Sequence, residues 1–239
     1  YDVYYWPNNA TATIIGEFEK DATLSLIAKY FGEHEKSSHE IPEVYTEEPV
    51  QEGPRRVVVK RSGQSGITAV AHKTPPGLDN DTYAIQVLGK ILCDGKSSRL
   101  YKKIVDTGLA TSLFMYDFPF KDNGLFITYA FLTPETDNQT VEDIIISEYN
   151  DIVKNGVDEK EILRAVAQIR ATVAFSRDGS YAVASALNEA IAIGDWEFYT
   201  TFLDKINLVT VNDIKRVVCK YLIEDQSTIG WFIPKNTDK

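Results

Sequence analysis

Histidine is scarce in this sequence, which limits the metal sites that the chain can form. Its 239 residues include three histidines, His34, His39 and His72. A catalytic zinc site needs two histidines and a carboxylate on the metal, and a helical pair of such histidines lies one turn apart on one face. His34 and His39 are five residues apart, about 140° around a helix, and His72 stands alone. We therefore predict no metal site and no bound cofactor in this chain.

Cysteines and long apolar runs are also limited. Cys93 and Cys219 do not form a Cys-x-x-Cys pair; we expect two buried apolar side chains, with a disulfide left open. No apolar run approaches the roughly 18–20 residues of a membrane-spanning helix, so no membrane span is predicted. The aromatic start, YDVYYWPNNA, lacks the features of a signal peptide. Because the first residue is Tyr1, we interpret the chain as an excised fragment whose compartment is unknown.

Basic charge is the third shortage. The net charge of −10 argues against nucleic acid as a partner, because proteins that bind it usually present a basic face. Solubility is the simplest role of an acidic surface, and a preference for basic peptides is the alternative. Apolar residues make up 44% of the chain, enough for a sizeable core in one large domain or two small ones.

The motifs for nucleotide binding and nucleophilic catalysis are incomplete. Residues 95–97, Gly-Lys-Ser, resemble the end of a phosphate-binding loop, but Lys90 occupies the position of its first glycine and the preceding segment is helical in pattern. There is no Gly-x-Ser-x-Gly elbow, and neither cysteine has a recognisable histidine partner. Chemistry alone therefore indicates no more than a soluble α+β domain.

The hydrophobic pattern predicts a strand–helix unit and then a linker. Ala10–Gly16 is rich in β-forming residues and ends at glycine, which is typical of a strand. Asp21 is expected to cap a helix that runs to Phe31. The acidic and polar segment 33–53 contains two prolines and no sustained period, so it is predicted to be a linker.

The remainder predicts an α+β domain. Five strands are expected, at 55–60, 66–73, 110–116, 124–131 and 227–233. Helices are expected at 82–92 and about 99–105, and along four apolar stripes at 141–152, 162–173, 187–196 (broken near Gly194) and 211–221. Strands joined by short turns and followed by helices favour an antiparallel-rich sheet with helices packed on one face.

A weak internal repeat indicates two related domains. Aligning Gly16 with Gly230 also aligns Phe18 with Phe232. The same type of strand would then occur near the start and at the end. This suggests that the chain begins in the tail of a first domain.

Three stretches, in the same order and spacing, resemble the insulinase/pitrilysin family of zinc metallopeptidases. They are YWPNNATATIIG with the following KYFG (5–16 and 29–32), GKSSRLYKKIVDTGL (95–109) and GVDEKEILRAVAQIR (156–170). The family fold is two similar α+β domains that close like a clamshell on a peptide. The resemblance implies that this chain is mainly the C-terminal, inactive domain.

The resemblance also implies a division of the chain. Residues 1–32 would be the terminal strand and helix of the preceding peptidase domain, 33–53 the linker, and 54–239 the inactive peptidase-like α+β domain. The zinc ligands and the general base of the family lie upstream of this region. Zinc is therefore expected in the upstream domain if the whole protein is active.

The family pattern also points to candidate site residues. Active members carry an arginine and a tyrosine in the second domain that hold substrate at the metal; these positions are occupied here by Val105 and Thr111, which puts a direct catalytic contribution in doubt. The loop of Gly95, Lys96, Ser97 and Ser98 corresponds to a glycine-rich loop implicated in substrate handling in processing subunits. The alternative is an ordinary helix–helix turn with Ser98 as N-cap.

Two functions follow from the resemblance. The first is a non-catalytic domain of a zinc metalloendopeptidase that encloses peptide substrate opposite a zinc-bearing domain, in cis or in trans. The alternative is a pseudo-peptidase scaffold or assembly subunit with no proteolytic role. A homo-oligomer is also possible on this reading, and nucleotide binding is not expected.

Overall fold

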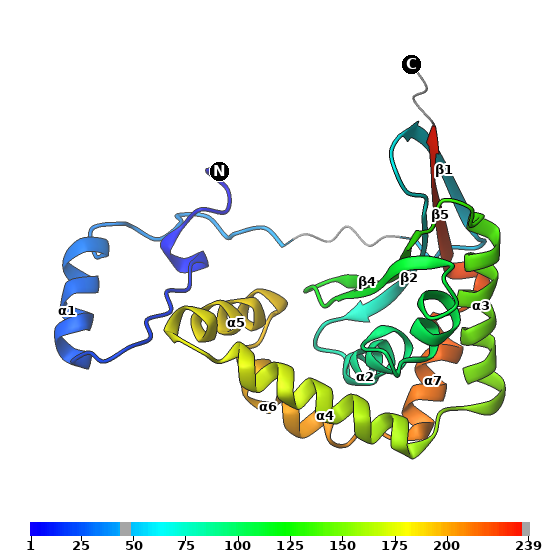
Figure 1. The fold of residues 1–239 in the computed structure, drawn as a ribbon. Helices are drawn as coiled ribbons and strands as arrows, with labels where there is room; N and C mark the ends of the chain where they lie inside the picture. The colour runs from blue at the N-terminus through cyan, green and yellow to red at the C-terminus, as the bar shows by residue number, and fades with distance from the viewer. Residues whose placement is uncertain (44–48, 236–239) are drawn as a thin grey trace.

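A five-stranded sheet with helices against one face forms the body of the molecule (Figure 1). The computed structural model describes residues 1–43 and 49–235; residues 44–48 of the predicted linker lie outside them. The strand order is β1-β5-β2-β4-β3, with β1 and β5 parallel and the other pairs antiparallel. The strands are β1 (Arg55–Ser62), β2 (Ile67–Pro76), β3 (Ala110–Phe118), β4 (Asn123–Leu132) and β5 (Ser227–Lys235).

The two faces of the sheet differ in burial. Along β2, Thr68, Val70 and His72 are buried, while the residues between them are partly exposed. Phe126 and Ala130 of β4 are fully buried in the same alternation. Since successive side chains of a strand point to opposite faces, one face of the sheet packs on helices and the other is left open. The α+β class with helices on one face is therefore confirmed.

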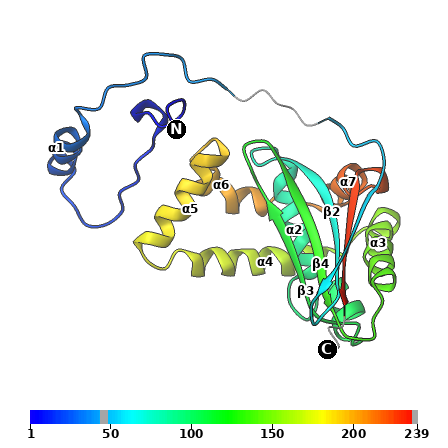
Figure 2. The ribbon, with the colours of Figure 1, turned by 90° about the horizontal axis from the view of Figure 1, so that it is seen from above.

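The described residues form seven α-helices, of which α2 to α7 cover the packed face or extend from it and α1 lies apart (Figures 1 and 2). They are α1 (Lys20–Phe31), α2 (Asp81–Cys93), α3 (Asn138–Asn155), α4 (Glu159–Ser176), α5 (Ser180–Ile193), α6 (Glu197–Ile206) and α7 (Val211–Tyr221). Helices α2, α3 and α7 pack on the sheet, and α4 packs on α2. Short π and 3-10 segments, η1 (Pro7–Asn9), η2 (Tyr101–Val105) and η3 (Glu224–Gln226), complete the elements. No described helix is long and apolar enough to cross a membrane.

The core lies between the sheet and α2, α3 and α7. Leu92, Ile152, Val217 and Phe126 have no exposed surface, and each such side chain stabilises the fold by roughly 1.5–3 kcal/mol through burial. The apolar stripes predicted at 141–152 and 211–221 face this core. Capping boxes at Asp158–Glu161 and Thr210–Asp213 fix the starts of α4 and α7.

The third apolar stripe forms two helices rather than one. Gly194, with a φ of +134°, ends α5, and α6 begins three residues later at Glu197. A positive φ favours glycine because it has no Cβ. The break predicted near Gly194 is thus confirmed, but Trp196 stands between the two helices and α6 was not predicted.

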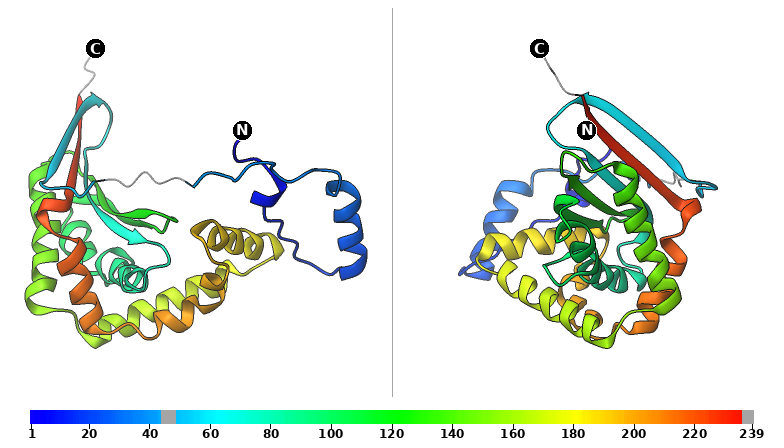
Figure 3. Two further views of the ribbon diagram at one scale, coloured as in Figure 1. Left: turned by 180° about the vertical axis from the view of Figure 1, so that it is seen from behind. Right: turned by 45° about the vertical axis from the view of Figure 1, so that its right-hand side comes forward.

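The N-terminal unit, residues 1–43, lies to one side of the body, beside α5 (Figure 3). Its Thr13 hydroxyl donates to Asn188 Oδ1 of α5 at 2.6 Å. The strand predicted at Ala10–Gly16 is wrong: the segment forms no strand, because no neighbouring strand is present in the described residues to pair its backbone groups. Asp21 is not the N-cap either, since α1 begins at Lys20 after Glu19.

His72 is a buried, uncharged histidine in the core. Its side chain is 1% exposed, and its ring lies edge-on to Tyr149 at 5.7 Å between centroids. Neither ring nitrogen has a well-formed hydrogen bond within the described residues. Burial lowers the pKa of His72 to about 4, and the backbone of Ile223 opposes this only weakly. The histidine that stood alone in the sequence is therefore a packing residue.

Acid should destabilise the fold through His72. Because the folded-state pKa is about 4 and the unfolded value is about 6.5, the unfolded chain binds the proton more readily, so stability present above about pH 6.5 is lost as the pH falls toward 4. The full loss is on the order of 3 kcal/mol, at about 1.4 kcal/mol per unit of pKa. Urea unfolding between pH 8 and pH 4.5 measures it.

The matched variant is His72→Leu, which removes the titrating ring. Burial raises the pKa of Asp117 to about 7, and a raised carboxyl pKa stabilises the fold as the pH falls, opposite in sign to His72. The difference between wild type and His72→Leu isolates the histidine. Equal pH dependence of the two proteins would contradict a neutral buried His72.

Candidate functional site around the Gly95–Leu109 segment

The predicted substrate loop is a tight turn between α2 and the next helical segment. Gly95 has a φ of +75°, and its carbonyl accepts hydrogen bonds from the backbone N–H (3.1 Å) and the hydroxyl (2.8 Å) of Ser98. Ser98 is fully buried, while Gly95 and Lys96 are exposed. The Ser98 hydroxyl thus closes the turn by donating to Gly95. An N-cap side chain would accept a hydrogen bond from a backbone N–H of the following helix. The N-cap position of η2 is Leu100, not Ser98.

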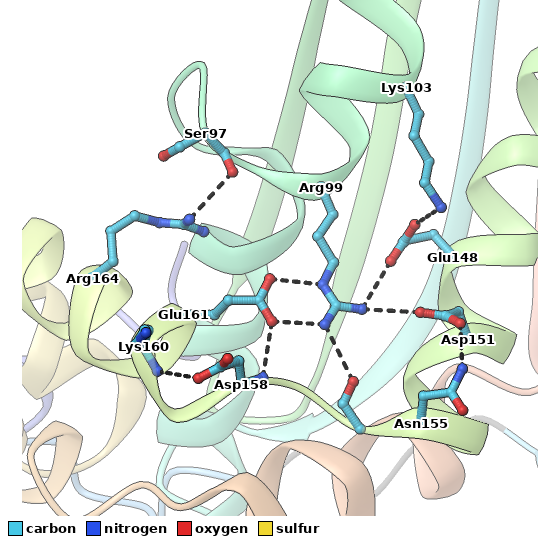
Figure 4. Close-up of polar contacts among 11 residues, drawn as sticks. Ser97, Arg99, Lys103, Glu148, Asp151, Asn155, Asp158, Lys160, Glu161 and Arg164 are labelled. Carbon is cyan, nitrogen blue, oxygen red and sulfur yellow. Dashed lines mark hydrogen bonds and ion pairs between the residues drawn. The ribbon is translucent and has the colours of Figure 1, made fainter.

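Helix α4 holds this turn from below. Arg164 Nη1 donates to the Ser97 carbonyl at 3.2 Å (Figure 4). A side chain at Gly95 would come within 3.2 Å of Gln168 Nε2. Within the turn of residues 95–98, Gly95 and Lys96 are exposed, Ser97 is half-buried and Ser98 is buried.

Arg99, the arginine of the Ser-Ser-Arg-Leu motif, anchors the segment to the α3–α4 connection (Figure 4). Its Nε and Nη2 bind the two oxygens of Glu161 at 2.8 and 2.7 Å. Its Nη1 donates to Glu148 at 3.0 Å and Asp151 at 3.2 Å, and Nη2 also reaches the Gly156 carbonyl at 3.2 Å. The five contacts match the five donors of a guanidinium. We call these five residues the Arg99 cluster.

The electrostatics of the cluster are those of a structural anchor. Glu148 is 1% exposed and also pairs with Lys103. The hydrogen bonds from Arg99 hold the pKa of Glu161 below its usual value and raise the pKa of Arg99 itself. Glu161 in turn accepts from the Asp158 backbone N–H at 3.0 Å in the α4 capping box. One carboxylate therefore starts α4 and fixes Arg99.

The resemblance matches Val105 and Thr111 to the family arginine and tyrosine, and the structure shows where these two residues lie. Val105 ends η2 and packs against the hydrophobic core. Thr111 lies at the start of β3, where the register with β4 shifts between Ala110 and Ser112, and its hydroxyl donates to the Phe131 carbonyl at 3.2 Å. A β-bulge of this kind re-aims a side chain. Val105 offers no polar group, and the Thr111 hydroxyl is used within the sheet.

The chemistry needed for zinc does not come together here. Across residues 1–43 and 49–235, no three histidine, cysteine or acidic side chains are grouped so that they could hold a metal ion. His72 is buried in the core, and His34 and His39 lie in the N-terminal unit. Cys93 is buried with its pKa raised to about 12 by desolvation, whereas Cys219 is exposed, which corrects the prediction that both are buried. The residues present do not fit a zinc site.

Comparison with known proteins now places the chain. Residues 1–169 match the sequence profile of the peptidase M16 inactive domain. With most of the chain matched, this protein belongs to the peptidase M16 family as an inactive domain.

Relatives that match almost the whole chain are about twice as long. The chain is 26% identical over 238 residues to the zinc protease PqqE of Helicobacter pylori, covering 98% of this chain and 53% of the relative. The crystal structure of a protease from Helicobacter pylori superposes with a TM-score of 0.91 at 25% identity, covering 98% of this chain and 57% of that one. The inactive peptidase domain of a zinc protease from Bordetella parapertussis covers 75% of this chain and 98% of its own, with a TM-score of 0.68 at 25% identity. This chain thus spans about half the length of the curated relatives it matches.

Sequence reasoning missed the Arg99 cluster. The partners of Arg99 lie 49 to 62 residues away, so no local pattern pairs them. The one available signal is the Asp-x-x-Glu spacing at Asp158–Glu161, which predicts a helix start but not a second role for Glu161.

Replacing Arg99 by lysine should destabilise the fold while keeping the charge. Lysine has three donors and no planar fork, so the paired contacts to Glu161 and the link to Gly156 cannot all be kept. Removing one partner of a buried ion pair costs about 3–5 kcal/mol; because lysine keeps the charge and loses hydrogen bonds, the expected cost is lower, about 1.5–3 kcal/mol. The change in the urea midpoint at constant m-value measures it.

Lys90→Gln is the matched control, because the pair of Lys90 with Asp94 lies at the surface, with Asp94 about half exposed. Its loss should cost less than about 1 kcal/mol. If Arg99→Lys and Lys90→Gln shift the midpoint equally, the Arg99 cluster is not the anchor inferred here.

Proposed function

We propose that this chain is the non-catalytic half of a zinc metallopeptidase and encloses peptide substrate opposite a zinc-bearing domain, in cis or in trans. The observation that carries the proposal is the pairing of an inactive M16 domain with the absence of a metal-ligating group in its described residues. Zinc and the general base then belong to the other half. The zinc protease PqqE of Helicobacter pylori, of which this chain covers 53%, supports this division of labour.

The N-terminal unit supports the presence of a partner domain. Helix α1 has no buried residue, and its apolar side chains Leu24, Leu26 and Phe31 are 51–65% exposed. A helix whose apolar stripe faces water gains almost nothing from packing, and exposed patches of this kind mark interaction sites. We infer that residues 1–32 complete the preceding domain, that 33–53 link the two, and that 54–239 form the inactive domain.

Strand β1 supports the same conclusion. All of its residues are exposed, including Val57, Val58 and Val59. Together with β5 it projects beyond the rest of the sheet (Figures 1 and 3). Alternate residues of one strand face opposite sides, and Val58 lies on the side of Arg56, which faces the helices, so this side of β1 offers apolar surface for a neighbouring domain.

Within this proposal, the four loop residues and the two substituted positions have different roles. Gly95 and Lys96 are exposed and can touch substrate, whereas Ser97 and Ser98 shape the turn. Val105 and Thr111 supply neither a charged fork nor a phenol to substrate at the metal. Their replacement is the observation that favours the alternative, a pseudo-peptidase scaffold that assembles without cutting.

The test is to express this chain alone and together with the zinc-bearing half that the proposal assigns to it. We expect the chain alone to bind no stoichiometric zinc and to cleave no peptide, and the assembled protein to carry one zinc and cleave a fluorogenic peptide. Zinc by plasma mass spectrometry and cleavage rate are the measurements. Stoichiometric zinc with cleavage by the chain alone would overturn the proposal; assembly with zinc but no cleavage would favour the scaffold.

A variant pair locates the contact. Leu24→Ser with Phe31→Ser removes apolar surface from α1 and should weaken assembly at least tenfold, since about 1.4 kcal/mol is tenfold and two large apolar side chains supply more than that. Lys29→Ser, on the same helix, should leave assembly unchanged.

A further inference from the structure

The open face of the sheet is apolar across all five strands. The strand register places the following residues on it: Arg55, Val57, Val59 and Arg61 of β1; Thr228, Gly230, Phe232 and Pro234 of β5; Ile67, Ala69, Ala71 and Lys73 of β2; Leu125, Ile127, Tyr129 and Phe131 of β4; and Ser112, Phe114, Tyr116 and Phe118 of β3. Alternate strand residues share a face, and the residues between them are those that face the helices. None of these positions carries a carboxylate.

Half of this face, over β3 and β4, is a continuous patch of aromatic rings. Tyr129 stacks on Phe114 and Tyr116 at 5.5 and 5.6 Å between centroids, and Phe118 stacks on Tyr116 at 5.5 Å and on Phe120 at 5.9 Å. Phe131 lies edge-on to Phe114 at 6.1 Å. We call these six rings the aromatic patch.

The rings of the aromatic patch face solvent in this chain. Tyr116 is 46% exposed and Phe120 is 53% exposed. Tyrosine hydroxyls are neutral near pH 7, and the neighbouring Tyr116 raises the pKa of Tyr129 further, to about 12. Contiguous exposed aromatic surface is rare on a soluble domain and marks a binding site. Stacked rings with free faces bind other flat or apolar side chains by the same contacts that hold them together.

The charges on the open face are of one sign. The three charged residues at its strand positions, Arg55, Arg61 and Lys73, are all cationic, although the chain as a whole carries −10. Lys73 is engaged within the chain, where it donates to the Pro49 carbonyl, so Arg55 and Arg61 are the cations considered for a ligand. Cations at the margin of an apolar surface attract acidic groups and repel basic ones. The local charge therefore points to an occupant with apolar centre and acidic flanks.

We propose that the open face binds extended peptide segments, mainly through the aromatic patch. These peptides have aromatic or large apolar residues at alternate positions and acidic residues beside them. The inference rests on the proposed function, because it assigns the substrate class that the enclosing half selects. It reverses the preference for basic peptides that the net charge of the sequence suggests.

The features of the face favour a peptide over other ligands of aromatic surfaces. An extended peptide points every second side chain to one side, at a repeat of about 6.6–6.8 Å, which suits a row of rings on one strand. A sugar would require several neighbouring carboxylates or amides as hydrogen-bond partners, whereas the strand positions of the face carry no carboxylate and one amide, Asn123 at the start of β4. A single-stranded nucleic acid requires a basic groove that follows its backbone as well as rings, and the strand positions of the face carry only three basic side chains, with Arg55 and Arg61 on β1, away from the rings on β3 and β4.

The experiment measures peptide binding to the 239-residue chain by fluorescence anisotropy. The probe is a labelled peptide with Phe, Tyr and Phe at alternate positions and two Glu at each end. Two comparison peptides keep the composition but place the rings side by side, or replace each Glu by Lys. We expect the Lys-flanked peptide to bind about threefold more weakly at low salt, with the difference lost near 0.5 M salt. Equal binding of all three peptides would overturn the proposal.

Variants on and off the face locate the binding. Phe114→Thr with Tyr116→Thr keeps β-forming residues on β3 and should weaken binding of the Glu-flanked peptide about tenfold, since each ring contact is worth roughly two- to tenfold. Phe175→Gln removes a ring that is 82% exposed on α4 and should change nothing. Arg55→Gln should weaken only the Glu-flanked peptide, whereas Lys60→Gln, on the other side of β1, should not.

The same double variant also tests whether a second copy of the chain, the zinc-bearing half or a nucleic acid covers the open face instead. The double variant is checked in parallel for folding by urea unfolding, for dimerisation by light scattering, and for assembly and zinc content with the zinc-bearing half. Loss of a dimer or of assembly in this variant would overturn the proposal, because a second copy or the partner domain would then cover the face. Tight binding of oligothymidine through the same rings would also overturn it. Normal assembly and zinc content without any peptide binding would remove this inference and leave the proposed function standing.

Discussion

The position of the whole Gly95–Leu109 segment depends on one guanidinium. Arg99 has every donor engaged, by Glu148, Glu161, Asp151 and a backbone carbonyl, so it can adopt only one orientation. Its partners belong to the end of α3 and the start of α4, and the chain that carries it leads through η2 into β3. A buried carboxylate such as Glu148 is stable only with a cation beside it. The Gly95–Leu109 segment and the α3–α4 connection therefore stabilise each other. Without Arg99, Glu161 and Asp151 would lose their ion-pair partner, and without these carboxylates the guanidinium of Arg99 would be left unpaired.

The Arg99 cluster is separate from Val105 and Thr111, the two residues that the resemblance matches to the family arginine and tyrosine. Val105 faces the core at the end of η2, where an apolar side chain adds to packing. Thr111 lies in the bulge of β3 and bonds to its neighbouring strand. Neither position contributes to the Arg99 cluster. The segment can thus keep its geometry in an inactive domain while the groups that would touch substrate at a metal are absent.

The sequence predicts the body of this fold well because its signals are local. Period-two strands such as Ile67–Pro76 and the stripe that contains Val217 and Val218 are both visible within a short window and both correct. The strand expected at Ala10–Gly16 failed because a strand is defined by its neighbour, which local preference cannot supply. The Arg99 cluster was hidden for a related reason: its members are far apart in sequence. The alternation of Phe114, Tyr116 and Phe118 is readable in the sequence, but only the register with β4 reveals that these rings share a face with Tyr129.

Charge is where composition misleads most. A net charge of −10 is a sum over the entire surface, whereas a bound peptide responds to charges within about one Debye length, roughly 8–10 Å at ordinary salt. Carboxylates such as Glu148, Glu161 and Asp81 are committed to cations in the helical layer, on the packed side of the sheet. The strand positions of the open face carry none, and their charged residues are cationic. The alternation of buried and exposed residues along the strands thus also separates the charges of the two faces. A ligand on the open face meets positive charge, although the net charge of the chain is negative.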